Sequence, residues 1–272
     1  MAKQERAART RESLVRAAAE VFAEEGFVTA SIAAISRRAG VSTGGLHFHF
    51  ESKTVLAGAV EDRAVEALRR ITVGRRVGVG GAVGAGAGAG ATGAGAGAGT
   101  GAGSVGAEGA GGCSGSGGSG GEGVGGVGGG LGNSLQVLVD STHALMALLA
   151  GDVVVRAGFG LSADAARESG VDLRRQWGVW VEDVLRAAAR EGALAEGVSP
   201  QDAARAVIAS TVGLEVLGAA ERDWVSPHTL TRFWTLMLPR LAARGTLGAL
   251  AAEGTGAAAL AAAGCGLSVG PS

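Results

Sequence analysis

Apolar residues recur every three or four positions over several stretches of the first 72 residues. The apolar positions of the first stretch, residues 5–25, are Leu14, Val15, Ala18, Val21 and Phe22. That spacing places them on one face of an α-helix. Gly26 follows, and glycine commonly ends a helix because it adopts the left-handed conformation without strain. The pattern predicts one long helix that ends at this glycine.

The next stretch predicts two short helices joined by a turn. Two isoleucines three residues apart give the segment 32–39 an apolar face, and Thr29 or Ser31 can cap its start. Gly40 then allows a tight turn, after which Ser42 can cap another short helix. A short helix, a glycine turn and a second short helix form the pattern of a helix-turn-helix, which many helical proteins share.

Helical periodicity continues from residue 53 and returns over the segment 134–245. In that segment the pairs Ser199–Pro200 and Ser226–Pro227 mark helix starts, because serine caps a helix and proline fits its first turn. The predicted fold class is all-α.

Glycine separates the two helical segments. Residues 73–133 are about half glycine, and such a chain loses much backbone entropy on ordering while it buries little surface. We therefore predict a disordered insert there. Its GxGxxG matches do not indicate a phosphate-binding loop, because such a loop continues with Lys-Ser or Lys-Thr and the insert contains no lysine. The chain thus divides into a segment 1–72, the insert, a segment 134–245 and a flexible tail over 246–272.

Composition and charge exclude several classes of protein. The 272 residues carry a formal net charge of −1, which gives no global sign of nucleic-acid binding. The N-terminal arm is nevertheless locally positive, through Lys3, Arg6, Arg9 and Arg11. Cys113 and Cys265 lack the spacing of a zinc site or a disulfide framework. The start of the chain is too polar for a signal peptide, and we expect no membrane span and a cytoplasmic location.

Two neighbouring histidines raise the question of a metal site. His47 and His49 lie two residues apart, so on a helix they point about 200° apart and cannot share one metal ion. His143 and His228 fall on other predicted helices. We predict no metal, no cofactor and no enzyme activity. A helical enzyme that does not bind DNA stays an alternative, for which the sequence offers no catalytic arrangement.

The stretch "GFVTASIAAISRRAGVSTGGLHFHFESKTVLAGAV" resembles the DNA-binding domain of TetR-family transcriptional repressors. The resemblance runs from Arg9 to Ala59. The variant "FHFESK", together with "MAKQERAARTRE" at the start, resembles the γ-butyrolactone autoregulator receptors in particular. The resemblance implies a TetR-like fold, with an N-terminal three-helix head and a C-terminal ligand-binding and dimerisation domain. It also implies a homodimer on a palindromic operator of double-stranded DNA.

The same resemblance implies which residues meet DNA. It places on the recognition helix Ser42, Thr43, Gly44, Gly45, Leu46 and His47. His49 and Lys53 are expected to meet phosphates, and Thr29 and Ser31 could do likewise from another helix start. By their apolar character, Leu46, Phe48 and Phe50 are expected to pack in the core of the head instead. His47 stands where the family usually has tyrosine, and Gly45 where it usually has alanine.

Ligand binding and dimerisation follow from the resemblance alone. The residues expected around a ligand cavity are Met146, Phe159, Trp177, Trp180 and Thr211. The resemblance favours Trp177 as the pocket tryptophan; alternatively, both tryptophans simply fill the core. The dimer bundle is expected to bury Val207, Thr211, Leu214, Leu217, Phe233, Leu236 and Leu238. The effector would be a γ-butyrolactone or an antibiotic-like metabolite, unless the insert uncouples the sensor and leaves a constitutive DNA binder.

Overall fold

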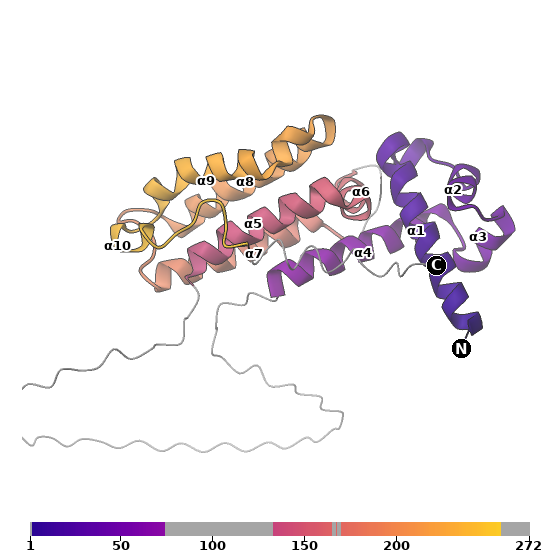
Figure 1. Ribbon diagram of the computed structural model, residues 1–272, viewed down its shortest axis with the longest axis horizontal. Helices are drawn as coiled ribbons and strands as arrows, with labels where there is room; N and C mark the ends of the chain where they lie inside the picture. The colour runs from indigo at the N-terminus through magenta and orange to yellow at the C-terminus, as the bar shows by residue number, and fades with distance from the viewer. Residues whose placement is uncertain (1, 74–132, 165–166, 168–169, 257–272) are drawn as a thin grey trace, which may run out of the picture. The chain divides into compact units, whose positions relative to one another are not determined.

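The computed structural model of the chain is helical, which confirms the all-α prediction (Figure 1). It describes residues 2–73, 133–164, 167 and 170–256. Over this part of the chain there is no strand, only one isolated β-bridge between Leu194 and Ala242. The predicted insert, except for its two end residues, and the last part of the predicted tail lie outside the described residues.

Four helices form the head. They are α1 (Ala2–Thr29), α2 (Ile32–Ala39), α3 (Thr43–His49) and α4 (Lys53–Val73). Gly26 interrupts α1 with a φ of 76°, as the sequence predicts for this glycine. The head has a hydrophobic core of its own, in which Leu14, Ile35, Leu46 and Leu56 are fully buried.

Local hydrogen bonds set the ends of the short helices. Ser31 rather than Thr29 caps α2, because its Oγ accepts from the backbone N–H of Ala34 at 3.1 Å. Gly40 closes α2 with a φ of 70°, and the Oγ of Ser42 accepts from the N–H of Gly45 at 3.0 Å to begin α3. Glycine and serine chemistry therefore fixes the angle between α2 and α3.

Among the described residues, the C-terminal domain contains six further α-helices of four to twenty-one residues, with one 3₁₀ turn between two of them. They are α5 (Ser134–Gly151), α6 (Val153–Ser162), α7 (Leu173–Arg190), α8 (Pro200–Ala220), η1 (Arg222–Val225), α9 (Pro227–Leu241) and α10 (Arg244–Leu247). Ser199 and Ser226 cap α8 and α9 in front of their first-turn prolines, as predicted. A second hydrophobic core lies between these helices, around Trp177 and Trp234.

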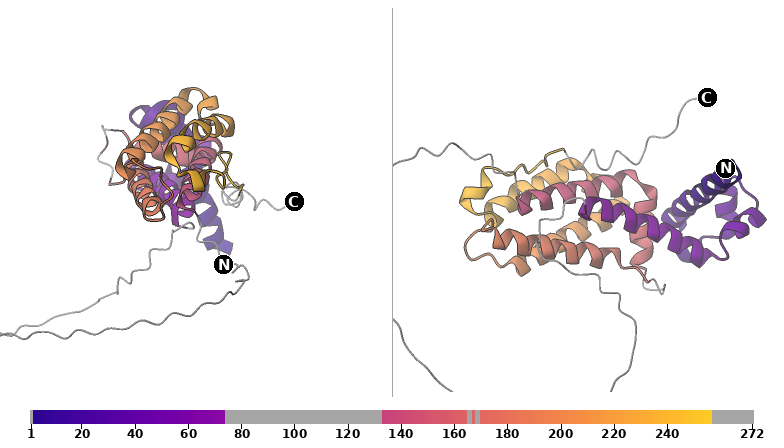
Figure 2. Two further views of the ribbon diagram at one scale, coloured as in Figure 1. Left: turned by 90° about the vertical axis from the view of Figure 1, so that its left-hand side faces the viewer. Right: turned by 90° about the horizontal axis from the view of Figure 1, so that it is seen from below.

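Helix α6 joins the head to the C-terminal domain. It packs against α1 and α4 of the head and also contacts α5 and α7, while α4 itself runs alongside α5 (Figure 2). Gly158 lets α6 approach α4 closely, since a Cβ at this position would come within 2.4 Å of the Cβ of Ala64. The head and the C-terminal helices are therefore in direct contact at Gly158, where any side chain would collide with α4.

The start of the predicted tail is docked rather than loose. Gln136 of α5 exchanges two hydrogen bonds with the backbone of Ala251. The carboxylate of Asp140 accepts from the backbone N–H and the hydroxyl of Thr255, at 2.8 and 2.7 Å. These contacts correct the predicted boundary at 246: the folded domain continues to the last described residue, 256.

Two helices are longer and more apolar than expected from the sequence. By length and composition, α5 and α8 could each cross a membrane, which corrects the expectation that no stretch would qualify. In α5 the apolar character has another explanation, because 67% of its apolar window is buried inside the protein. In α8 only 28% is buried, so this helix leaves apolar side chains on the surface.

Candidate functional site

Helix α3 presents a small polar surface. Thr43, Gly44 and His47 are exposed, whereas Gly45 and His49 are half-buried. Ser42 is exposed as well, although its Oγ is engaged as the helix cap. Of the residues expected to meet DNA, Thr43 and His47 thus have side chains that a partner can reach, and their DNA contacts remain a prediction.

The hydrophobic residues of this helix divide differently from the expectation. Leu46 is 0% exposed and Phe50 2%, so both pack in the head core, and Leu46 supports the recognition helix rather than facing DNA. Phe48, which was expected in that core, is 83% exposed. Residues two apart on a helix point to opposite sides, so Leu46 and Phe48 cannot both face inward. The outward face of α3 is therefore partly aromatic.

The ammonium group of Lys53 is hydrogen-bonded to the backbone of the head. Its Nζ donates to the backbone carbonyls of Phe27, Val28 and Ala30 at 2.8, 3.2 and 2.8 Å, and lies 4.6 Å from the ring centroid of Phe27. An ammonium group has three N–H donors, so all of them are engaged. A direct phosphate contact, as expected from the sequence, would require Lys53 to give up one of these bonds.

Arginines around the head are held in defined positions. Arg38 of α2 forms ion pairs with Glu20 and Glu24 of α1, at 3.4 and 2.7 Å. The Arg38 hydrogen bond holds the pKa of Glu24 below its usual value. Arg11 of α1 lies over the ring of Phe50, 5.0 Å from its centroid. These contacts fix α2 and the end of α3 against α1, so α3 is positioned by charged as well as apolar groups.

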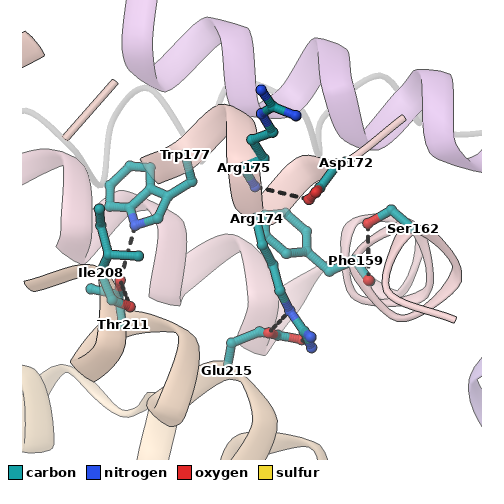
Figure 3. Close-up of polar contacts among 9 residues, drawn as sticks. All are labelled: Phe159, Ser162, Asp172, Arg174, Arg175, Trp177, Ile208, Thr211 and Glu215. Carbon is teal, nitrogen blue, oxygen red and sulfur yellow. Dashed lines mark hydrogen bonds and ion pairs between the residues drawn. The ribbon is translucent and has the colours of Figure 1, made fainter. Parts of the chain in front are cut away.

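The residues expected around a ligand lie inside the C-terminal core. Trp177 is 1% exposed, and its indole N–H donates to the hydroxyl of Thr211 at 2.9 Å (Figure 3). That hydroxyl in turn donates to the carbonyl of Val207 at 2.9 Å. Trp180 is half-buried and stacks on Trp177 at 5.0 Å between ring centroids. Met146 and Phe159 are also buried, at 1% and 2% exposure.

A second tryptophan of the same kind was not predicted from the sequence. Trp234 of α9 is fully buried, and its indole N–H donates to the hydroxyl of Thr142 at 2.7 Å. The spacing of Leu230, Trp234 and Leu238 at four-residue steps could have predicted this, since it places all three on one face of a helix. All three are buried. Phe233, Leu236 and Leu238 of this helix were expected in the dimer bundle; within the single chain Leu238 is buried and Leu236 is 77% exposed.

A cavity lies elsewhere, where the head meets the C-terminal domain. It has a volume of about 580 Å³ and is lined by the end of α1, by α6, by the end of α8 and by η1. None of the five residues expected around a ligand is on its wall. Its wall carries instead the side chains of Phe22, Phe27, Arg156 and Arg222. No signal in the sequence joins these residues, which are brought together only by folding.

Comparisons with known proteins agree with this architecture. Residues 14–60 match the family of bacterial regulatory proteins known as the tetR family. The chain is 25% identical to the A-factor receptor protein of Streptomyces griseus over 258 residues, which is 93% of this chain and 71% of that protein.

Two solved structures have the same fold. A γ-butyrolactone receptor (ArpA-like protein) aligns with a TM-score of 0.63 and 19% identity, over 95% of this chain and 99% of the other. The TetR-family protein CprB from Streptomyces coelicolor, in complex with its operator sequence, aligns with a TM-score of 0.61 and 21% identity, over 94% and 98%. Residues 14–60, which contain the helix-turn-helix, thus match the tetR family of bacterial regulatory proteins, and over most of its length the chain is similar to the A-factor receptor protein and has the fold of γ-butyrolactone receptors.

Proposed function

We propose that the protein is a homodimeric, cytoplasmic repressor that binds a palindromic operator and releases it when a small molecule binds. The effector is a γ-butyrolactone or an antibiotic-like metabolite, and the regulated genes belong to secondary metabolism. Proteins of this family are transcription regulators rather than enzymes.

The observation that carries the DNA-binding proposal is the geometry of α2 and α3. Two serine caps and a left-handed glycine hold α3 so that Thr43 and His47 face outward. A recognition helix of this kind contacts base edges from its first residues. Phe48 adds an exposed aromatic side chain, which suits apolar contact with a thymine methyl group.

The dimer proposal rests on apolar side chains that the single chain leaves uncovered. Val216 and Leu217 of α8 are 49% and 46% exposed, and Leu236 of α9 is 77% exposed. Leu217 and Leu236 are two of the residues expected in the dimer bundle. A palindromic operator needs two recognition helices about one DNA turn apart, which one chain cannot supply. A second copy that covers α8 and α9 would meet both requirements.

Release of DNA requires that the C-terminal domain can move the head. Helix α6 packs on α4 at Gly158, and Glu61 of α4 forms a 2.7 Å ion pair with Arg167, which follows α6. Both side chains are about 95% buried. Arg167 also lies 4.6 Å from the ring centroid of Phe27 at the end of α1. These contacts support the proposal that a movement of the C-terminal domain on ligand binding would also move the head.

A second candidate is a constitutive DNA binder with no functional sensor. The packed surroundings of Trp177 favour this candidate, because its indole is buried and its N–H already donates to Thr211. The two candidates share the DNA-binding head and differ only in whether a small molecule weakens the complex with DNA.

A gel shift with the DNA that flanks the protein's own gene tests the DNA-binding proposal. At near-physiological salt and with excess nonspecific competitor, we expect a discrete shift for the wild type. His47→Ala should weaken this complex about tenfold or more, since a base contact contributes about 1–3 kcal/mol. The matched control is His228→Ala, an exposed histidine on α9, which should bind as the wild type does. Equal binding by both variants would remove His47 from the interface.

Sedimentation analysis tests the dimer. Leu236→Glu should give a monomer at concentrations where the wild type is a dimer, because a charge would enter an apolar contact. Val179→Glu, at a 51% exposed position of α7, serves as the matched control and should remain dimeric. A dimeric Leu236→Glu protein, or a monomeric wild type, would contradict the proposed interface.

A further inference from the structure

We propose that the cavity between the head and the C-terminal domain is a binding site for a small amphiphile with an apolar body and an anionic head group. This site is separate from the tryptophan-lined centre where the family resemblance places the ligand. We refer to it below as the junction cavity, bounded by the ends of α1 and α8 and by α6 and η1.

The size and the walls of the junction cavity suit a small molecule. Its volume of about 580 Å³ falls within the range of roughly 300–1,000 Å³ that is usual for ligand sites. The apolar part of its wall is formed by Phe22, Phe27, Leu149, Val153, Ala157 and Leu161. These side chains come from both domains, so an apolar body in the cavity would contact the head and the C-terminal helices together.

Two arginines converge at one side of this apolar wall. The Nη1 atom of Arg156 donates to the carbonyls of Leu149 and Ala150, at 2.9 and 3.4 Å. The Nη1 atom of Arg222 donates to the same two carbonyls, at 3.3 and 3.2 Å. These carbonyls belong to the last turn of α5, whose partial negative charge attracts cations. Two guanidinium groups from different elements are thus held side by side.

This pairing of like charges favours an anionic ligand. Burial and, after it, the charge of Arg222 lower the pKa of Arg156, while the charge of Asp152 raises it. Each guanidinium carries five N–H donors, and the bonds to α5 use Nη1 alone. A carboxylate or sulfonate beside them would accept charge-assisted hydrogen bonds and offset the repulsion.

Most carboxylates on the same wall form ion pairs with other arginines. Glu20 and Glu24 pair with Arg38, and Glu215 pairs with Arg174 at 2.8 Å. Asp164 is the fourth carboxylate on the wall. Because the first three carboxylates already have arginine partners outside the cavity, they leave Arg156 and Arg222 as the cations that a ligand would meet.

Occupancy of the junction cavity would bear directly on DNA binding if the chain is the repressor proposed above. The cavity wall includes the end of α1, which belongs to the head, and α6, which packs on α4. A ligand that fits only one relative position of these helices favours that position by its difference in affinity. Ligand binding itself does not depend on the repressor role and can be measured without DNA.

The test uses a matched pair of fluorescent probes on the full chain. The anionic probe is 8-anilinonaphthalene-1-sulfonate, and its neutral counterpart is N-phenyl-1-naphthylamine, which has the same rings without the sulfonate. We expect the double variant Arg156→Gln/Arg222→Gln to weaken the sulfonate at least tenfold and to change the affinity of the neutral probe little. Arg205→Gln, at an exposed arginine near the start of α8, is the control and should bind both probes as the wild type does.

A second variant keeps the test decisive if the double variant does not fold. Gly160 of α6 lies on the cavity wall, and a Cβ there would meet no atom within 4 Å. Gly160→Phe should therefore fill the cavity without collision at its Cβ and weaken both probes. Unchanged sulfonate affinity in a folded double variant or in Gly160→Phe would overturn the proposal. So would loss of the sulfonate site in Trp177→Phe, which would move the site to the centre of the domain.

Discussion

The centre of the C-terminal domain and the junction cavity are both walled by apolar helices, yet their polar groups are arranged in different ways. In the centre, each indole N–H donates to a threonine hydroxyl, from Trp177 to Thr211 and from Trp234 to Thr142. Each threonine then donates to a carbonyl of its own helix. At the junction, two arginines share two carbonyls and stand beside a cavity.

The difference bears on where a small molecule can be recognised. Buried polar groups that are fully paired stabilise one arrangement of a core, and a ligand must break those bonds to enter. Groups with donors to spare next to a cavity can bind a ligand without such a loss. We therefore propose that the tryptophans act first as structural residues and that the arginines are better placed to recognise a ligand.

The largest expected effect concerns Trp177. If it is a core residue, Trp177→Ala should lower the free energy of unfolding by about 3–5 kcal/mol, through lost burial and the cavity left behind. The matched control is Trp224→Ala, because Trp224 is 39% exposed, and its effect should be much smaller. Urea unfolding followed by circular dichroism measures both. Similar midpoints for the two variants would show that Trp177 lines an open site instead.

The next effect concerns the ion pair that joins the two domains. Glu61→Gln should cost about 3 kcal/mol of stability, because it leaves the buried charge of Arg167 without its partner. Glu12→Gln removes one partner of the exposed pair between Glu12 and Arg63 and should cost less than about 1 kcal/mol. Equal costs in chemical unfolding would mean that the Glu61–Arg167 pair does not couple the domains as its burial suggests.

The smallest effect concerns Glu24, a carboxylate on the wall of the junction cavity. Its pair with Arg38 lowers its pKa below the usual 4.5, so the pair stabilises the fold above that pH. The stabilisation is lost as the pH falls through the lowered pKa of the folded state. The difference in thermal midpoint between wild type and Arg38→Gln should therefore be largest above pH 4.5 and shrink in acid. A difference that grows in acid would have the wrong sign.

The head could be predicted from the sequence more fully than the C-terminal domain. Its turn depends on residues close together in the chain, such as Ser31, Gly40 and Ser42, whose hydrogen bonds span only three or four residues. Even there, Phe48 was assigned by its apolar character, although its position two residues after the buried Leu46 turns it outward. Local pattern therefore gave the elements correctly but not every side chain's direction.

The junction cavity could not have been predicted in this way. Phe22, Arg156 and Arg222 are separated by long stretches of sequence, and they meet because Gly158 lets α6 approach α4 and because Gly218 lets η1 approach α8. At Gly218, a Cβ would come within 2.5 Å of Val225. The sequence shows these glycines, but which residues face them depends on how distant helices pack.

A crystal structure of the full chain grown with 8-anilinonaphthalene-1-sulfonate would test the central claim most directly. The account predicts the sulfonate beside Arg156 and Arg222, with the rings against Phe22 and Phe27, and Trp177 still bonded to Thr211. A probe inserted beside Trp177, with the junction cavity empty, would contradict it.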